Sequence, residues 1–194
     1  MAENLINAYP NVVNDVANGT LKEIDYDLVK GVREFTWNKI KEKIINNYLI
    51  SDIITMLKPL GVTYTMIKKL LFDEPNPVLL KQQLEDNPYL LTKINGLGFK
   101  KVDNLALKLK PEFINSTERL VAFIKYYFTD LGDSKGHTWC SVKILKSAIS
   151  NNVPECVDKV DWLLENNEFL HIEDDKVGLK YYYDIEMQIY NLLL

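Results

Sequence analysis

Apolar positions at helical spacing form the main pattern of the chain, and between residues 87 and 109 they flank a pair of glycines. This stretch reads NPYLLTKINGLGFKKVDNLALKL. Three apolar residues precede a pair of glycines, Gly96 and Gly98, and four follow it at helical spacing: Leu90, Leu91 and Ile94, then Val102, Leu105, Ala106 and Leu109. The spacing predicts the end of one helix, a tight glycine hairpin and a second helix.

A weaker form of this plan occurs twice earlier, after Gly31 and Gly61. An aliphatic residue follows each glycine directly, and large apolar residues stand six and nine positions later: Val32, Trp37 and Ile40; Val62, Ile67 and Leu70; Leu97, Val102 and Leu105. Repeated helix pairs bury their faces against one another, so residues 27–110 are expected to form one all-α core. Chance alignment is the alternative, because only four positions match in each copy.

Only the third copy has a second glycine, since Arg33 and Thr63 stand at that position in the first two copies. Both residues have a Cβ, which makes a positive φ costly. The sequence therefore predicts that the first two hairpins are scaffold and that the third has a different role.

Caps and breakers outline the other elements of the first half. A short helix is expected between Pro10 and Gly19, and apolar residues at helical spacing run from residue 28 to residue 45. Ser51 is a suitable cap for a separate helix over residues 52–57. Two further helices are expected over residues 63–72 and 78–84.

The second half changes in texture after Pro111. Ser116 or Thr117 can cap a helix over residues 118–131, and Ser141 can cap one that ends near residue 149. A short β-prone segment (137–140) lies between them, and a helix starting at Pro154 follows. Residues 169–173 and 176–183 are expected to form a β-hairpin, with a helix-like tail over residues 184–194.

This order of elements is that of a winged helix. The predicted fold is therefore mainly α, with tandem helix-hairpin-helix repeats followed by a small winged-helix-like domain that has a C-terminal β-hairpin. The expected domains are an N-terminal segment (1–27), a helix-hairpin-helix domain (28–110) and the winged-helix-like domain (111–194).

Charge limits the affinity that this chain can have for nucleic acids. The net charge is −4, whereas sequence-independent binding of DNA depends mostly on neutralised phosphates. Residues 91–110 nevertheless contain five lysines (93, 100, 101, 108 and 110) and one acid, Asp103, a local balance of +4. With two cysteines, no long apolar run and no leader-like N-terminus, the chain is expected to be a cytoplasmic protein, without a membrane partner and monomeric.

The third hairpin is the candidate binding site. A glycine hairpin that opens a helix leaves backbone N–H groups pointing outward, and a phosphate is a natural partner for them. The candidate residues for contact with a DNA backbone are Gly96, Leu97, Gly98, Phe99, Lys100 and Lys101, with Lys93, Lys30 and Arg33 as secondary candidates. The alternative is a helix-to-helix turn whose glycines serve packing alone.

Other chemistry finds little support in the sequence. A zinc site would have to combine His137, Cys140, Cys156 and His171, but the cysteines lack the close spacing of structural zinc sites. No catalytic residue, metal or cofactor is therefore expected. The segment 181–183 is three tyrosines, which could stack on bases. On a strand, Tyr181 and Tyr183 would share one face, which favours a place in the core.

The stretch from Asn87 to Leu109, followed by Glu118-Arg119 and Gly136-His137, resembles the N-terminal region of the long RecD-like helicases, homologues of the exodeoxyribonuclease V alpha subunit. Eleven residues are in register with the family phrase: Asn87, Pro88, Tyr89, Leu91, Gly96, Gly98, Phe99, Asp103, Ala106, Gly136 and His137. The resemblance covers about residues 28–183. Val102 departs from it, because the family usually has alanine there.

In that family this region precedes a superfamily-one motor that uses ATP to move 5′ to 3′ on single-stranded DNA. The resemblance implies bacterial proteins of DNA repair or recombination, with ATP and Mg²⁺ bound by the motor. The phosphate-binding motif G-x-x-x-x-G-K-[ST] does not occur in this sequence. The chain is therefore expected to be a non-catalytic region that holds single-stranded or junction DNA without sequence specificity and adjoins a motor. The alternative is a protein-interaction or spacer module with structural hairpins.

Overall fold

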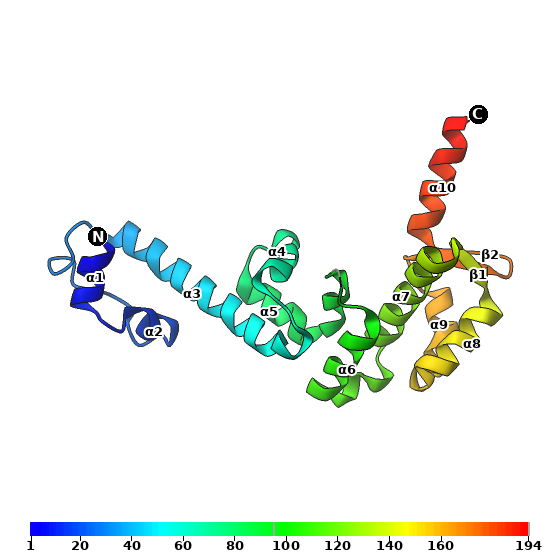
Figure 1. Cartoon of the computed structure of the whole chain (residues 1–194), viewed down its shortest axis with the longest axis horizontal. Helices are drawn as coiled ribbons and strands as arrows, with labels where there is room; N and C mark the ends of the chain where they lie inside the picture. The colour runs from blue at the N-terminus through cyan, green and yellow to red at the C-terminus, as the bar shows by residue number, and fades with distance from the viewer. Residues whose placement is uncertain (95, 194) are drawn as a thin grey trace. The chain divides into compact units, whose positions relative to one another are not determined.

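The structure is a computed structural model that describes residues 1–94 and 96–193. Helices dominate it and the only strands among these residues form one small sheet, which confirms the predicted mainly α fold (Figure 1). The chain forms two compact units, residues 1–86 and residues 87–194. Within the described residues, no helix has both the length and the apolar character needed to span a membrane.

The first unit contains five α-helices and a short 3₁₀ helix among its residues: α1 (Ala2–Ala8), α2 (Val12–Ala17), α3 (Glu34–Leu57), η1 (Lys58–Leu60), α4 (Tyr64–Asp73) and α5 (Pro77–Asp86). Helix α3 corrects the prediction of a separate helix capped by Ser51. The hydroxyl of Thr55 donates to the Ser51 carbonyl at 2.8 Å, inside one continuous helix of 24 residues. A serine can end or cap a helix, but here apolar spacing on both sides of Ser51 keeps the helix intact.

The N-terminal segment shares its core with the first hairpin. Leu5, Val12, Val16 and Ile24 are buried together with Val29, Val32 and Trp37. The indole Nε1 of Trp37 donates to the Lys22 carbonyl at 3.2 Å. The first 27 residues therefore pack on the first hairpin and on the start of α3, a contact that the sequence did not predict.

The three hairpins have a common geometry, which supports the repeat over chance alignment. We name them hairpin 1 (residues 29–33), hairpin 2 (58–63) and hairpin 3 (94–98). The first glycine of each has a positive φ: +87° at Gly31, +71° at Gly61 and +87° at Gly96. The aliphatic residue that follows is at most 5% exposed, and the residue six positions after each glycine is fully buried: Val32, Val62, Leu97; Trp37, Ile67, Val102.

The second position of each hairpin is extended, contrary to the reasoning from sequence. Arg33 has φ −130°, Thr63 −110° and Gly98 −70°, each with ψ between 161° and 172°. A Cβ is compatible with this conformation. Positive φ therefore does not explain why only hairpin 3 has a second glycine.

The second unit begins with η2 (Pro88–Lys93), α6 (Phe99–Leu109) and η3 (Pro111–Asn115), followed by the long α7 (Thr117–Lys135). The remaining elements are β1 (Trp139–Ser141), α8 (Val142–Asn152), η4 (Pro154–Lys159), α9 (Val160–Glu165), β2 (Leu170–Glu173), β3 (Lys176–Leu179) and α10 (Lys180–Leu193). The sheet is antiparallel in the order β1-β3-β2. This is the predicted order of helix, short strand, two helices and hairpin (Figure 1).

Both predicted serine caps of the second unit are confirmed. The Ser116 hydroxyl accepts from the Arg119 amide at 3.0 Å, and the Ser141 hydroxyl accepts from the Ile144 amide at 3.3 Å. Helix α7 then buries its apolar face, with Leu120, Ile124 and Phe128 fully covered.

The compact units differ from the predicted all-α core. Residues 87–109 belong to the second unit, where Phe99 packs on Phe123 of α7, so one core over residues 27–110 is not found. The domain ranges 1–27, 28–110 and 111–194 stay predictions, since one sequence domain can contain parts of two compact units.

The predicted strand over residues 176–183 is wrong in its second half. Strand β3 ends at Leu179, and Lys180 begins α10 with an i,i+4 ion pair to Asp184 at 2.7 Å. Tyr181 is consequently 68% exposed, so its predicted place in the core is also wrong. Tyr183 is half-buried and stacks on His171, with 3.5 Å between ring centroids. A helical pair of opposite charges here outweighs the β propensity of three tyrosines.

Candidate nucleic-acid interface

Hairpin 3 turns its backbone outward around one buried side chain. The Leu97 amide donates to the Ile94 carbonyl at 3.0 Å and closes the turn. Leu97 and Ile94 are buried, whereas Gly96 and Gly98 are exposed. Asn95 lies outside the described residues. Leu97 therefore anchors the hairpin from the protein side, and the two glycines form its open side.

The first turn of α6 has amides available to a ligand. The Gly98 carbonyl accepts from the amides of Lys101 and Val102 at 3.1 and 3.3 Å. The amides of Gly98, Phe99 and Lys100 precede the first helical bonds, and none of them has an acceptor among the described residues. Such groups carry the partial positive charge of a helix N-terminus.

The second glycine leaves this backbone uncovered. A Cβ at Gly98 would meet nothing within 4 Å, and the backbone there suits any residue. Neither packing nor conformation within the described protein therefore requires a glycine at this position. What a side chain would change is the access of an outside group to the amides.

Lys100 and Lys101 supply the charge next to these amides. Both side chains are exposed, and neither has an ion pair or a hydrogen bond with another described residue. Phe99 differs from the other candidates, because its ring is 4% exposed and packs on Tyr89 and Phe123. Phe99 can thus offer only its backbone amide, and its side chain fixes the start of α6.

The secondary candidates are less suitable. Lys93 is exposed, but it already interacts with another group of the protein. Lys30 and Arg33 are exposed in hairpin 1, where Glu34 directly follows and adds a negative charge. They belong to the first unit, so hairpin 3 does not include them.

Helix α7 contributes residues that the sequence analysis missed. A groove of about 510 Å³ runs beside hairpin 3 and is bordered on α7 by Lys125, Tyr126, Thr129 and Asp133. The ring of Tyr126 stacks on Phe99 at 5.9 Å. The spacing of these residues places them on one helix face, but no local pattern indicates that this face adjoins the hairpin.

A buried ionic network fixes hairpin 3 to the rest of the second unit. Arg119 of α7, 6% exposed, contacts Asp103 of α6 through Nε at 2.9 Å and Nη2 at 3.1 Å. Its Nη1 donates to Glu155 at 2.9 Å and to the Ile114 carbonyl at 2.7 Å. The hydroxyl of Tyr89 donates to Asp103 at 2.7 Å. The network thus joins α6, α7, η2, η3 and η4.

The pKa values in this network follow from burial and pairing. Burial alone would lower the pKa of Arg119, but its hydrogen bonds to Asp103 and Glu155 raise it above the ordinary value. Burial, then the hydrogen bond to Asp103, raises the pKa of Tyr89. The pKa of Glu155 is lowered by its own backbone amide and by Arg119. Arg119 therefore stays charged, Tyr89 neutral and Glu155 charged at neutral pH.

Both cysteines are buried. Cys140 and Cys156 are free thiols, and burial raises the pKa of each. The described residues contain no group of three or more His, Cys, Asp or Glu side chains placed to hold a metal ion. The expectation that the chain binds no metal or cofactor stays a prediction.

Comparison with known proteins agrees with this geometry. Residues 46–139 match the family described as the ATP-dependent RecD2 DNA helicase HHH domain. A search of curated proteins found no match. The matched residues include hairpins 2 and 3 and the Arg119–Asp103 pair. The family match thus covers the main features of the candidate interface. Residues 46–139 are therefore similar to the helix-hairpin-helix domain of the ATP-dependent RecD2 DNA helicases, which confirms the resemblance to the N-terminal region of RecD-like helicases.

Proposed function

We propose that hairpin 3 holds the sugar–phosphate backbone of DNA, single-stranded or at a junction, without reading its sequence. The observation that carries this proposal is the open backbone at Gly98, whose neighbouring amides have no acceptor among the described residues. Amides and ammonium groups contact phosphates, which are the same at every base, so such contacts position DNA without specifying a sequence.

The family match of residues 46–139 supports a proposal for the role of the whole region. We propose that this chain is a non-catalytic accessory region of a bacterial RecD2-type helicase of DNA repair or recombination, next to a motor that moves 5′ to 3′. ATP and Mg²⁺ would bind to that motor, because the sequence of this chain lacks the phosphate-binding motif. The motor domains would then be its protein partners in the cytoplasm.

A salt titration with the full chain tests the backbone contact. Binding of a fluorescent dT20 oligonucleotide and of a forked duplex is measured by anisotropy from low to moderate salt. Affinity should fall as salt rises, and Lys100→Ala with Lys101→Ala should weaken binding to both DNAs. If the two lysine substitutions remove two phosphate contacts, the plot of log K against log salt for single-stranded DNA should become less steep, by about 1.4 in the magnitude of its slope.

Matched variants separate this site from general charge. Lys68→Ala with Lys69→Ala makes the same charge change at a tandem pair of exposed lysines on α4, and it should change affinity much less. Gly98→Val covers the amides at a position where the backbone accepts a side chain. It should reduce DNA binding with little change in stability.

The alternative is a protein-interaction or spacer module, and the net charge of −4 favours it. Undetectable DNA binding at low salt would reject the DNA proposal for this chain. Equal losses in the two lysine pairs would also reject it, because they would show general electrostatics instead of a grip at hairpin 3.

A further inference from the structure

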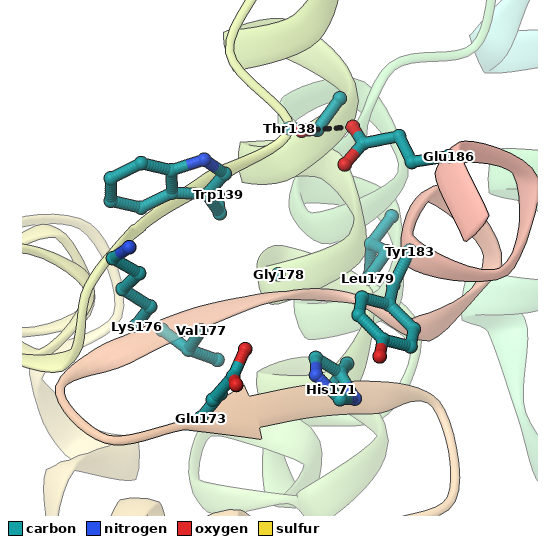
Figure 2. A pocket seen from close by; sticks show the side chains of 10 residues that line it. All are labelled: Thr138, Trp139, His171, Glu173, Lys176, Val177, Gly178, Leu179, Tyr183 and Glu186. Atoms are coloured by element: carbon teal, nitrogen blue, oxygen red, sulfur yellow. Dashed lines mark hydrogen bonds between the residues drawn. The ribbon is translucent and has the colours of Figure 1, made fainter. Parts of the chain in front are cut away.

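A second candidate site lies on the outer face of the small sheet (Figure 2). Trp139, Gly178 and His171 are directly opposite one another across β1, β3 and β2. Neighbouring strands are about 4.8 Å apart, so the two ring-bearing residues stand roughly 10 Å apart at the backbone. Because the residue between them is glycine, a gap remains over the centre of the sheet.

This gap is a pocket of about 190 Å³, which we call the sheet pocket. Tyr183 and Glu186 of α10 close one side, and Thr138 donates to the Glu186 carboxylate at 2.7 Å. Glu173 points into the pocket from β2, and the Trp139 ring, 51% exposed, forms the opposite rim (Figure 2). A Cβ at Gly178 would lie 2.6 Å from the Thr138 carbonyl oxygen, so the fold itself requires the glycine.

The charges of the sheet pocket favour a cation. Two carboxylates, Glu173 and Glu186, oppose one ammonium group, Lys176. The Lys176 Nζ lies over the Trp139 ring, 4.7 Å from its centroid. This contact shows that the indole face is accessible to a cation, although one already occupies it.

His171 gives an independent sign that the sheet pocket is incomplete. Its Nε2 is a buried side-chain nitrogen with no hydrogen-bond partner among the described residues. Buried polar atoms nearly always have a partner, and an exception often marks a site that something else completes.

We propose that the sheet pocket binds the guanidinium group of an arginine presented by a partner protein. A guanidinium is planar, can stack on the Trp139 ring and has five donors that can serve two carboxylates at once. A lysine ammonium is compact and lacks this planar fork. DNA suits the pocket poorly, because Glu173, Glu186 and the turn residues Asp174 and Asp175 would repel its phosphates.

This inference is independent of DNA binding at hairpin 3. It gives the winged-helix-like part a role in docking to protein, whichever role the hairpin has. The two sites can therefore fail separately in experiments on the same chain.

The test uses NMR of the ¹⁵N-labelled chain and three acetylated, amidated peptides: Gly-Arg-Gly, Gly-Lys-Gly and Gly-citrulline-Gly. Citrulline has the shape of arginine without its charge. The arginine peptide should shift the indole N–H of Trp139 and the amide of Gly178 most strongly. The lysine peptide should shift them less, and the citrulline peptide should leave them almost unchanged.

Variants assign the effect to named groups. Glu173→Gln and Glu186→Gln change exposed side chains. Each should lower the affinity for the arginine peptide by about tenfold, as expected for a lost charge-assisted hydrogen bond. Lys176→Met removes the competing cation and should strengthen binding. A charge-neutral change in the first unit, Gln82→Met, should have no effect.

Three outcomes would overturn the proposal. They are an absence of shifts at Trp139 and Gly178, equal shifts with citrulline, and shifts with dT20 larger than those with the arginine peptide. If the glutamine variants fail to fold, the comparison of peptides on the unaltered chain and the Lys176→Met variant still decide the question.

Discussion

Arg119 offers the sharpest test of how hairpin 3 is held. Arg119→Met removes four hydrogen bonds, two to Asp103 and one each to Glu155 and the Ile114 carbonyl. The Asp103 side chain is only 14% exposed and would keep the Tyr89 hydroxyl as its single partner of this network. Breaking a buried pair at one partner costs about 3–5 kcal/mol, because a buried charge is left uncompensated. We therefore expect the free energy of unfolding of the second unit to fall by about 3–5 kcal/mol.

Hydrogen exchange measured by mass spectrometry at increasing urea suits this prediction, because its peptides report on each compact unit separately. In Arg119→Met, peptides from α6 and α7 should lose protection, while those from α3 should keep theirs. Arg33→Met is the matched control, since Arg33 is exposed and has no ion pair with another described residue. It should change stability by less than about 0.5 kcal/mol.

A second substitution tests the reason for the loss. Asp103→Asn added to Arg119→Met removes the uncompensated charge and should restore part of the protection of α6. A cost below about 1 kcal/mol for Arg119→Met would refute the reasoning, and so would a further loss in the double variant.

Three further predictions concern strain, acid and thiols. Gly96→Ala should destabilise the second unit by about 1–2 kcal/mol in urea unfolding, because φ is +87°, whereas Gly98→Ala should be neutral or slightly stabilising. Folding lowers the pKa of Glu155 below its ordinary value of 4.5. The stability that its carboxylate contributes is therefore present above pH 4.5 and is lost as pH falls through the lower folded pKa. In Glu155→Gln, stability should fall less steeply as pH decreases below 4.5. Cys140 and Cys156 should react with iodoacetamide only slowly until urea unfolds the chain, because burial raises the pKa of both thiols.

Much of the fold could be predicted from the sequence, because each hairpin combines several local signals. The glycine at positive φ, the buried aliphatic residue after it and the anchor six positions later depend on residues close in sequence, so spacing reveals them. The same holds for the Ser116 and Ser141 caps.

Packing between segments that are distant in the sequence could not be predicted from local patterns. Nothing local indicates that Val12 and Val16 pack beside Trp37, or that Tyr126 stacks on Phe99. The Arg119 network was equally hidden, since its acidic partners lie 16 and 36 residues away from it. Such contacts depend on how elements meet, and periodicity describes each element alone.

The prediction of a strand over residues 180–183 was wrong for a different reason. Three consecutive tyrosines favour a strand, and a neighbouring strand already supplied a hairpin partner. The ladder nevertheless ends where the Lys180 amide donates to the Phe169 carbonyl at 2.8 Å, and the Lys180–Asp184 pair supports a helix from there. Tertiary context and an i,i+4 pair thus outweighed propensity.

The two glycines of hairpin 3 differ in backbone conformation, so the reason for a glycine differs between the two positions. Gly96 is fixed by its own backbone, because a left-handed φ penalises any other residue whether or not DNA is present. Gly98 has an ordinary extended backbone and open space where a Cβ would stand. The first two hairpins show that the fold accepts Arg33 and Thr63 at the equivalent position. Neither the backbone conformation nor the packing of the described residues explains Gly98, and this supports the proposal that a phosphate approaches the exposed amides closely.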